Sequence, residues 1–455
     1  MTITRHMIAA LTALALVIPG IAPARQKQRW TVKPEWVLAH ETFLAGPELQ
    51  GRGSATRDEA IAAAYVAAQF RGFGLKTAPG MSGYLQTTNI TRMRLNGRAV
   101  LSAGGVPLVG ASLLIASGQG VRGALTVFAG DDAKDLPTAD VVLATSTRAN
   151  GFALLRAATA KKIKLLIIPE SDLTRARTAM SGGDPQLPLY AEGAAPAPRA
   201  ALASLPSAAI EKLAAAPGSV VALALPEVVL STGPTTNAVG YLPGTDPKAG
   251  VLLLSAHLDH IGVRGDGVVM SGANDDASGT IAVIELARAL AAGKPMKRGI
   301  LFVAYGSEEA GGFGARYFVD HPPVPLSQIV ANLEIEMIGA QDPKLPKGVM
   351  MMTGYDRSTF GETLKSHGAL VTADPYPEQN FFQRSDNYAL ALQGVVAHTV
   401  SGWALVPTYH SPNDTVENID IGFMTAAIQS LIEPMRWLAS SDYAPSWKPG
   451  GKPGK

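Results

Sequence analysis

Two short, continuous apolar runs in the second half of the chain constrain its fold most. Residues 251–254 and 300–304 contain no polar side chain, which is typical of strands buried on both faces of a sheet. Between them, apolar residues recur at i, i+3, i+4 and i+7 from Val283, as on one face of a helix. The alternation of strands and helices over 233–440 predicts an α/β fold with a mostly parallel, open sheet flanked by helices. Further strands are predicted over 329–337, 349–353 and 395–400.

The remaining residues differ in composition from this region. Residues 91–232 are rich in Ala, Gly and Pro, carry short apolar runs and one or two helical patterns, and contain no histidine. We therefore predict a small inserted α+β domain there, which divides one larger domain into residues 25–90 and 233–440. Residues 441–455 are rich in Gly, Pro and Lys, and they are predicted to be a disordered tail.

The beginning of the chain has the pattern of a secretory signal. Arg5 precedes an apolar segment over 7–18, and residues 22–24 give a small-x-small cleavage pattern. We predict that residues 1–24 are a signal peptide and that the mature protein is secreted or periplasmic. No other apolar run is long enough to cross a bilayer, so we expect no membrane span after the signal is removed.

The absence of cysteine narrows the chemistry. It excludes disulfides, thiolate zinc sites, iron–sulfur clusters and a cysteine nucleophile. Any bound metal must use His, Asp and Glu, and the chain has 8 His. The formal charge of +2 gives no basic field, so we expect no nucleic-acid partner. The sequence also lacks a Gly-x-Ser-x-Gly nucleophile elbow and a nucleotide-binding P-loop.

Acidic residues and histidines stand directly after the predicted strands, at the start of the helix between two of them, and in one later loop. Because the carboxyl ends of parallel strands meet at one edge of a sheet, loops far apart in sequence converge there. Several carboxylates at one point repel one another and raise each other's pKa, and divalent cations remove that cost. Nitrogen and oxygen donors without thiolate suit zinc, with manganese or cobalt as alternatives. The acidic residues and histidines concerned are His257, Asp259, Asp275, Asp276, Glu308, Glu309, Glu336, His410 and Asp414, and Tyr409 stands directly before His410.

In this order, these motifs resemble metallopeptidase family 28, the di-zinc aminopeptidases related to aminopeptidase Y. The resemblance covers about 233–440 and implies a zinc-exopeptidase (phosphorylase-like) fold that acts on a peptide substrate. The segment Gly51-Arg52-Gly53 also resembles the start of bacterial members, and residues 91–232 resemble a protease-associated domain. The motifs are His257-x-Asp259, Gly-Ala-Asn-Asp275-Asp276, Ser-Glu308-Glu309, Glu336-Met-Ile-Gly and Tyr409-His410-x-Pro-x-Asp414-Thr.

The resemblance implies two zinc ions per chain and a ligand set for each. Asp275 would bridge the two ions. His257 and Glu336 would complete one site. Glu309 and His410 would complete the other site. Many family members have Asp where this chain has Glu336, and others have Glu.

The same resemblance assigns catalytic and supporting groups. Glu308 would be the general base, which takes a proton from a water activated by both metals and passes it to the leaving amine. Tyr409 would hydrogen-bond the substrate carbonyl. Asp259 would hold the ring of His257 without binding metal. Asp276 would also be a supporting residue, joined to the preceding aspartate by a cis peptide bond.

Several residues keep alternative interpretations. Glu334 competes with Glu336 as a ligand, because alternation along a strand puts both on the same face. His260 is interpreted as a supporting residue rather than a ligand, and His398 as a core histidine with satisfied hydrogen bonds. Asp414 either orients the last histidine ligand or caps the following turn.

The leading functional interpretation is an exported, zinc-dependent aminopeptidase, with Asp275, Glu308 and Asp386 as candidates for holding the substrate amine. A carboxypeptidase of the same fold is an alternative, since Arg384 is a candidate cation for a substrate carboxylate. A glutaminyl cyclase, which keeps one metal, and a non-catalytic binding ectodomain are further alternatives. The ectodomain would be expected to lack Glu308 or a metal ligand, and neither is missing here.

Overall fold

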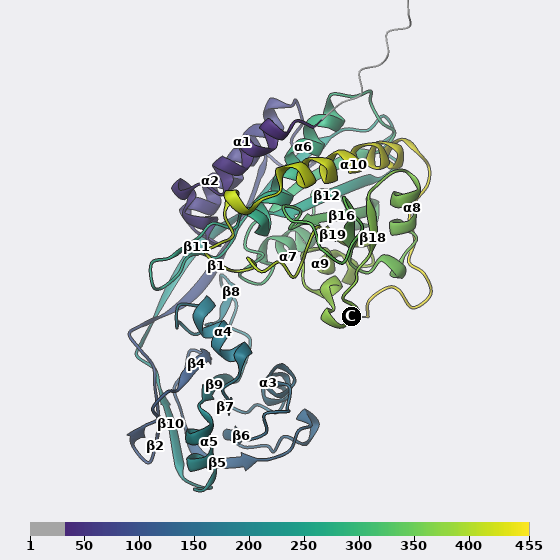
Figure 1. The fold of residues 1–455 in the computed structure, drawn as a ribbon. Helices are drawn as coiled ribbons and strands as arrows, with labels where there is room; N and C mark the ends of the chain where they lie inside the picture. The colour runs from purple at the N-terminus through teal and green to yellow at the C-terminus, as the bar shows by residue number, and fades with distance from the viewer. Residues whose placement is uncertain (1–31, 455) are drawn as a thin grey trace, which may run out of the picture. The chain divides into compact units, whose positions relative to one another are not determined.

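The predicted strands of the second half of the chain assemble into one sheet. In the computed structural model, which describes residues 32–454, this sheet has nine strands in the order β18-β17-β19-β16-β12-β15-β11-β1-β8 (Figure 1). The central pairs β15–β12, β12–β16 and β16–β19 are parallel, and every residue of β12 and β15 is buried, as the apolar runs predict. The strands are β1 (Leu85–Asn96), β8 (Leu189–Ala191), β11 (Glu227–Leu242), β12 (Val251–His257), β15 (Gly299–Tyr305), β16 (Ile329–Glu336), β17 (Met350–Met352), β18 (Val371–Ala373) and β19 (Ala397–Ser401).

Helices cover both faces of this sheet. The helix predicted around Val283 is α6, which packs on β12, β15 and β16 and is buried along almost its whole length. Helices α1, α2 and α10 pack around α6, whereas α7 and α9 contact the sheet from the other side (Figure 1). The helices are α1 (Pro34–Leu44), α2 (Arg57–Gly72), α6 (Ser278–Ala291), α7 (Phe313–Asp320), α8 (Phe360–Ser366), α9 (Asn387–Leu392) and α10 (Ile421–Ser440).

The predicted insertion forms a second sheet with its own core. Its strand order is β3-β2-β10-β5-β6-β7-β9-β4, and β5, β6, β7 and β9 run parallel. The strands are β2 (Val100–Ala103), β3 (Val106–Pro107), β4 (Ser112–Ile115), β5 (Val121–Phe128), β6 (Val141–Ala144), β7 (Leu165–Pro169), β9 (Ala201–Leu205) and β10 (Val220–Ala224). The helices here are α3 (Gly151–Ala160), α4 (Asp172–Met180) and α5 (Ser207–Ala214).

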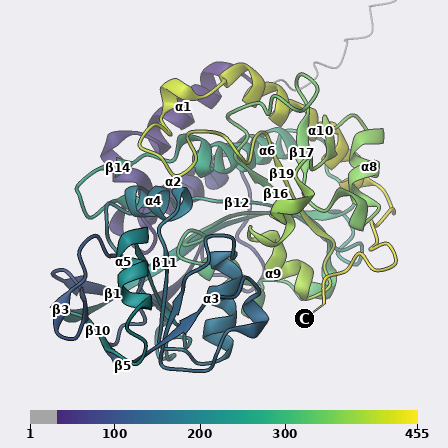
Figure 2. The same ribbon diagram turned by 60° about the horizontal axis from the view of Figure 1, so that its bottom comes forward.

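A long antiparallel ribbon links the two sheets along the chain. Strands β1 and β11 pair from Leu85↔Ala238 to Asn96↔Glu227 and lie side by side in both ribbon views (Figures 1 and 2). Because β11 also pairs with β15, the ribbon is an extension of the nine-stranded sheet. A further small hairpin consists of β13 (Gly262–Val263) and β14 (Val269–Met270).

The two ends of the chain differ in how they compare with the predictions. The predicted signal peptide, residues 1–24, lies outside the described residues. The prediction of a disordered tail is wrong for 441–454, because Trp447 pairs with Ser358 and packs edge to face on Phe382. Among the described residues, no helix combines the length and apolar character that a membrane span requires.

Candidate metal centre

The five predicted metal ligands come from separate strand ends and loops at the carboxyl edge of the first sheet. His257 is the last residue of β12, and Glu336 is the last residue of β16. Glu309 follows β15, and Asp275 lies in the short π-helical turn Ala273–Ala277 that leads into α6. His410 lies in the loop after β19. The parallel topology therefore brings these side chains to one place, as the sequence pattern indicates.

Asp275 is shared between two groups of donors. Its Oδ1 lies 3.3 Å from His257 Nε2, and that nitrogen lies 3.4 Å from Glu336 Oε1. Its Oδ2 lies 3.2 Å from His410 Nε2, and that nitrogen lies 3.1 Å from Glu309 Oε1. Each group therefore joins an imidazole to two carboxylates, with the Asp275 carboxylate between them.

His260 joins the second group, although its sequence position suggested only a supporting role. Its Nδ1 lies 2.9 Å from Glu309 Oε1 and 3.9 Å from Asp275 Oδ2. Its ring meets the ring of His410 edge to face, with the centroids 5.6 Å apart. The sequence contained one signal for this position. His260 follows His257 by only three residues, so its imidazole stays at the same edge of the sheet.

The donor atoms at this edge of the sheet are better satisfied by divalent cations than by hydrogen bonds to one another. His257 Nε2, both ring nitrogens of His260 and Asp275 Oδ2 are buried, and their close approaches to neighbouring groups do not have hydrogen-bond geometry. Burial opposes the charge of His410, but Glu309 and Asp275 outweigh it and raise the His410 pKa to about 10. Buried charge that is incompletely paired is costly, and imidazole with carboxylate oxygen is a zinc-type donor set. The described residues therefore form a metal site with two His/Asp/Glu clusters.

Comparison with known proteins shows which family the region around the metal centre resembles. Residues 237–433 match the model of Peptidase family M28. This region belongs to peptidase family M28. Leupeptin-inactivating enzyme 1 of Streptomyces exfoliatus is 29% identical over 212 residues, which are 42% of this chain and 47% of that enzyme. Aminopeptidase YwaD of Bacillus subtilis is 26% identical over 175 residues, 37% of each chain, so the chain matches less than half the length of these relatives.

Two solved structures extend the similarity beyond the M28 region. The aminopeptidase from Aneurinibacillus sp. strain AM-1 superimposes with a TM-score of 0.66 at 17% identity, over 89% of this chain and 93% of that one. BSAP, a zinc aminopeptidase from Bacillus subtilis, gives 0.60 at 18% identity, over 91% and 97%. At these identities the similarity shows the fold alone. It includes the inserted sheet, which is consistent with a protease-associated-like domain.

Asp414 holds the M28 region's shared carboxylate through the backbone. It is buried, and its two carboxylate oxygens accept the N–H groups of Asn274 and Asp275 at 2.8 and 3.0 Å. The sequence suggested that Asp414 orients His410 or caps the following turn. Its carboxylate instead binds the backbone of the Asp275 turn. A loop distant in sequence fixes where Asp275 stands.

Asp276 connects three elements of the M28 centre. Its peptide bond with the preceding aspartate is cis, as the resemblance implies. Its carboxylate accepts the backbone N–H groups of His257, Gly279 and Met337 at 3.3, 2.9 and 3.0 Å. These groups belong to the end of β12, the start of α6 and the residue after β16, so Asp276 fixes the spacing between elements that carry ligands.

Asp259 connects a ligand to the residue predicted as general base. Its carbonyl oxygen lies 3.2 Å from His257 Nδ1, whereas its carboxylate lies 3.8 Å from that nitrogen. The carboxylate instead accepts the backbone N–H of Glu308 at 2.9 Å and the hydroxyl of Ser54 at 2.6 Å. Burial and neighbouring carboxylates, among them Glu309, raise the pKa of Glu308 well above its ordinary value.

Arg52 is a supporting residue whose role the sequence did not reveal. It is fully buried, and its guanidinium donates to four backbone carbonyls. Nε donates to Leu258 at 2.8 Å, Nη1 to Leu44 and Ser271 at 2.5 and 2.8 Å, and Nη2 to Gly272 at 2.7 Å. Leu258 follows His257 and Gly272 precedes the Asp275 turn, so one side chain ties two ligand loops together.

The glycine before Arg52 makes this approach possible. Gly51 has φ +70°, and a Cβ there would collide with the carbonyl group of Met270. The sequence indicated the Gly51-Arg52-Gly53 segment only through a resemblance. Its physical reason, a close backbone approach beneath the ligand loops, needs the tertiary structure.

Tyr409 lines a pocket beside the centre. Its ring stacks on the ring of His410, with the centroids 3.9 Å apart. Burial and nearby carboxylates such as Glu309 raise the Tyr409 pKa, so the hydroxyl keeps its proton and can donate. The pocket encloses about 40 Å³, and Glu336 and Arg384 line it as well. The other walls come from Met337, Met351, Thr353, Phe381, Thr399, Ser401 and Ala404.

Three other residues singled out from the sequence lie outside both metal clusters of the described chain. Glu334 is buried deeper than Glu336 and accepts a hydrogen bond from Ser255. His398 is a core histidine, as predicted: both ring nitrogens have partners, and burial lowers its pKa to about 4. Asp386 is buried, and burial raises its pKa to about 8.

Proposed function

We propose that this protein is an exported aminopeptidase that holds two zinc ions and hydrolyses the first residue from peptides. The observation that carries the proposal is the Asp275 carboxylate, shared between two donor groups at 3.2 and 3.3 Å. The M28 match and the relatives named as aminopeptidases support it. Export rests on the signal-like segment 1–24 and is tested by determining the first residue of the mature protein.

The residues divide between the two zinc ions by the groups in which they stand. His257, Glu336 and Asp275 would hold one ion. Glu309 and His410, with Asp275 in common, would hold the other. When bound, a zinc pair lowers the pKa of a water molecule and polarises a carbonyl group.

Glu308 is the residue we assign to proton transfer. Its backbone N–H is fixed by Asp259 at 2.9 Å, so the loop that carries the carboxylate is held beside the metal clusters. A carboxyl group with a raised pKa takes a proton from water and returns it to the leaving amine more readily than an ordinary one.

Tyr409 and its pocket are assigned to the substrate. The protonated hydroxyl of Tyr409 would donate to the carbonyl oxygen as negative charge develops on it. The pocket next to Glu336 would receive the side chain of the residue that is removed. The carboxylates beside it would attract a free amino terminus.

A carboxypeptidase is the second candidate, and one observation favours it. Arg384 lines the same pocket, and its guanidinium would suit a substrate carboxylate. Aminoacyl and carboxyl-terminal reporter peptides distinguish the two functions. We expect hydrolysis of aminoacyl reporters alone, and the reverse preference would establish the carboxypeptidase.

Metal content and one substitution test the rest of the proposal. We expect two zinc ions per chain, loss of hydrolysis with a chelator and recovery with zinc. Glu308→Gln should reduce kcat by about 100- to 10,000-fold and keep both ions. One ion per chain would favour a cyclase, no bound metal would favour a binding ectodomain, and full turnover by Glu308→Gln would refute its role.

A further inference from the structure

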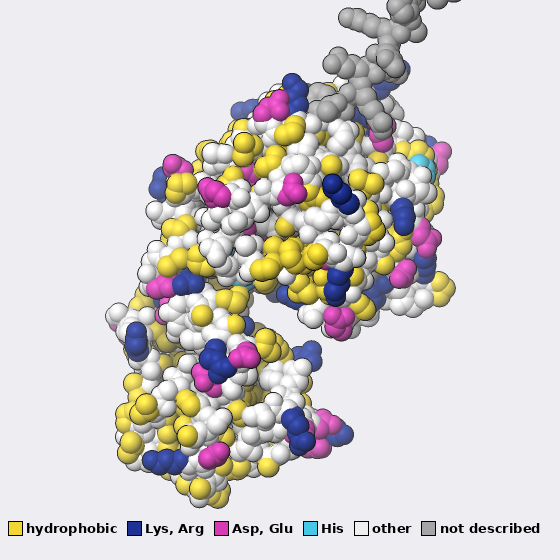
Figure 3. Space-filling model, in the orientation of Figure 1, with side chains coloured by type: hydrophobic (Ala, Val, Ile, Leu, Met, Phe, Trp, Pro, Cys, Tyr) yellow, Lys and Arg dark blue, Asp and Glu magenta, His cyan; other side chains and the backbone are white. Residues whose placement is uncertain are grey.

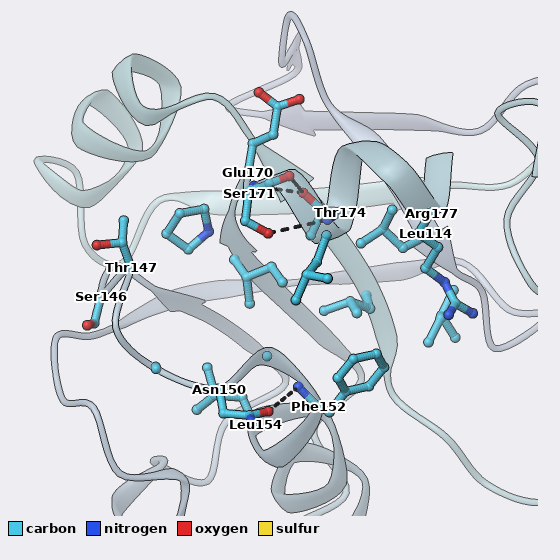
Figure 4. Close-up of a pocket in the computed structure, with 17 residues that line it drawn as sticks. Leu114, Ser146, Thr147, Asn150, Phe152, Leu154, Glu170, Ser171, Thr174 and Arg177 are labelled. Atoms are coloured by element: carbon cyan, nitrogen blue, oxygen red, sulfur yellow. Dashed lines mark hydrogen bonds between the residues drawn. The ribbon is translucent and has the colours of Figure 1, made fainter. Parts of the chain in front are cut away.

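The inserted sheet carries an apolar pocket that has no part in the metal centre. It lies at the carboxyl ends of β6 and β7, between the first turns of α3 and α4 (Figure 4). The cavity measures about 260 Å³, just below the usual range of ligand pockets, about 300–1,000 Å³. Its apolar lining includes Leu114, Ile115, Leu154, Ile168 and Leu202.

Two large apolar side chains on the rim are exposed to solvent. Phe152, in the first turn of α3, is 62% exposed, and Leu173, in the first turn of α4, is 73% exposed. Both line the pocket. On the face shown in Figure 3, acidic and basic side chains are interspersed with apolar ones, so no single charge dominates it. Exposed apolar groups around a concave apolar pocket are typical of a binding site.

Most polar groups of the rim already have partners within the chain. The Asn150 side chain accepts the N–H groups of Phe152 and Ala153 at the start of α3. Ser171 and Thr174 form a capping box at the start of α4. These groups stabilise the two helix ends, so their hydrogen-bonding capacity is already used within the chain.

Arg177 is the cation in the pocket lining. Figure 4 shows it on the side opposite Ser146 and Thr147. It donates to Gln186 Oε1 at 2.5 Å, and no carboxylate of residues 32–454 lies within ion-pair distance of it. Burial lowers its pKa, and burial together with Arg177 lowers the pKa of Arg199. Within residues 32–454, neither of these two half-buried guanidinium groups forms an ion pair, so an anion beside Arg177 would offset its positive charge.

We propose that this pocket binds the carboxyl-terminal residue of a peptide. A bulky apolar side chain would fill the cavity, and the terminal carboxylate would pair with Arg177. The cavity is large enough for one such side chain, while the exposed surfaces of Phe152 and Leu173 would cover the preceding residues of an extended chain. The inference does not depend on the proposed hydrolysis, because it concerns binding to the inserted sheet.

Calorimetry on the full chain tests the proposal. The probes are N-acetyl-Ala-Ala-Leu with a free carboxylate and the same peptide as its amide, and Glu308→Gln in all proteins prevents turnover. We expect the acid to bind at least tenfold more tightly than the amide. Arg177→Gln should remove this preference, and Arg175→Gln, on the same helix but exposed and paired with Glu170 and Asp172, should keep it.

Further measurements distinguish peptide binding from fatty-acid binding, and this proposal from the proposed hydrolysis. Phe152→Ser should weaken both peptides by a similar factor. Equal binding of acid and amide, or an unchanged preference in Arg177→Gln, would overturn the proposal, as would binding of decanoate without binding of the peptide. With Glu308 restored, Arg177→Gln should hydrolyse leucyl-p-nitroanilide at the normal rate. Absence of hydrolysis in the parent would count against the proposed function and leave the binding result intact.

Discussion

The two sheets both present loops at the carboxyl ends of parallel strands, but the loops carry different chemistry. After β12, β15 and β16, buried imidazoles and carboxylates converge, and several of their close approaches do not have hydrogen-bond geometry. After β6 and β7, the strands end in an apolar pocket whose polar rim is largely used to cap helices. Parallel topology therefore supplies a place for a ligand, and the residues after each strand decide which ligand it is.

The first way to break this comparison is to remove the shared carboxylate. We expect Asp275→Asn to reduce hydrolysis by at least about 1,000-fold and to lower zinc content, since a neutral amide neither bridges two cations nor balances two histidines. Reporter assays and metal analysis measure both effects. Asp320→Asn, the same change at an exposed position, is the control. Normal zinc content in Asp275→Asn would contradict the shared site.

The second test concerns the charge beneath the ligand loops. Arg52→Met should lower the free energy of unfolding by about 3–5 kcal/mol, because it leaves four carbonyl acceptors and the buried Glu41 without their cation. The thermal midpoint and zinc content should fall together. Arg57→Met, at the exposed start of α2, is the matched control. An effect on stability without any effect on zinc would show that Arg52 does not position the ligands.

The third test addresses the apolar core of the inserted sheet. Leu143 in β6 is fully buried, and Leu143→Ala should cost about 2–5 kcal/mol through the cavity it leaves. Below the unfolding temperature, zinc content and hydrolysis of a single-residue reporter should stay normal. Denaturant unfolding, metal analysis and the reporter assay measure these quantities. A fall in zinc content would show that the two regions are not chemically separate.

The smallest expected effect is a pH dependence of stability at His398. Its pKa of about 4 in the folded protein lies below the ordinary value of about 6.5, so the unfolded chain binds more protons between these values. Stability should therefore decrease as the pH falls through this window, by up to about 3 kcal/mol. His398→Asn should flatten the dependence of the thermal midpoint on pH from 7 to 4. His321→Asn, at an exposed histidine, should leave it unchanged.

Local patterns predicted the central sheet well. The runs at 251–254 and 300–304 became β12 and β15, and the strands expected over 329–337 and 395–400 became β16 and β19. Such runs are informative because a strand covered on both faces must be apolar throughout. The end of the chain was predicted less well, since the Gly and Pro content of 441–454 gave no sign of the contact between Trp447 and Phe382.

The sequence by itself determined the donor types and the edge of the sheet at which they meet. With no cysteine, a metal had to be held by His, Asp and Glu, and parallel strands deliver their following residues to one edge. Only the tertiary structure decided that His260 joins one of the two donor groups around Asp275, and that Arg52 and Asp414 hold the loops. The physical reason is that hydrogen bonds and ion pairs act over a few ångströms, and residues far apart in the chain come that close only when the loops have packed.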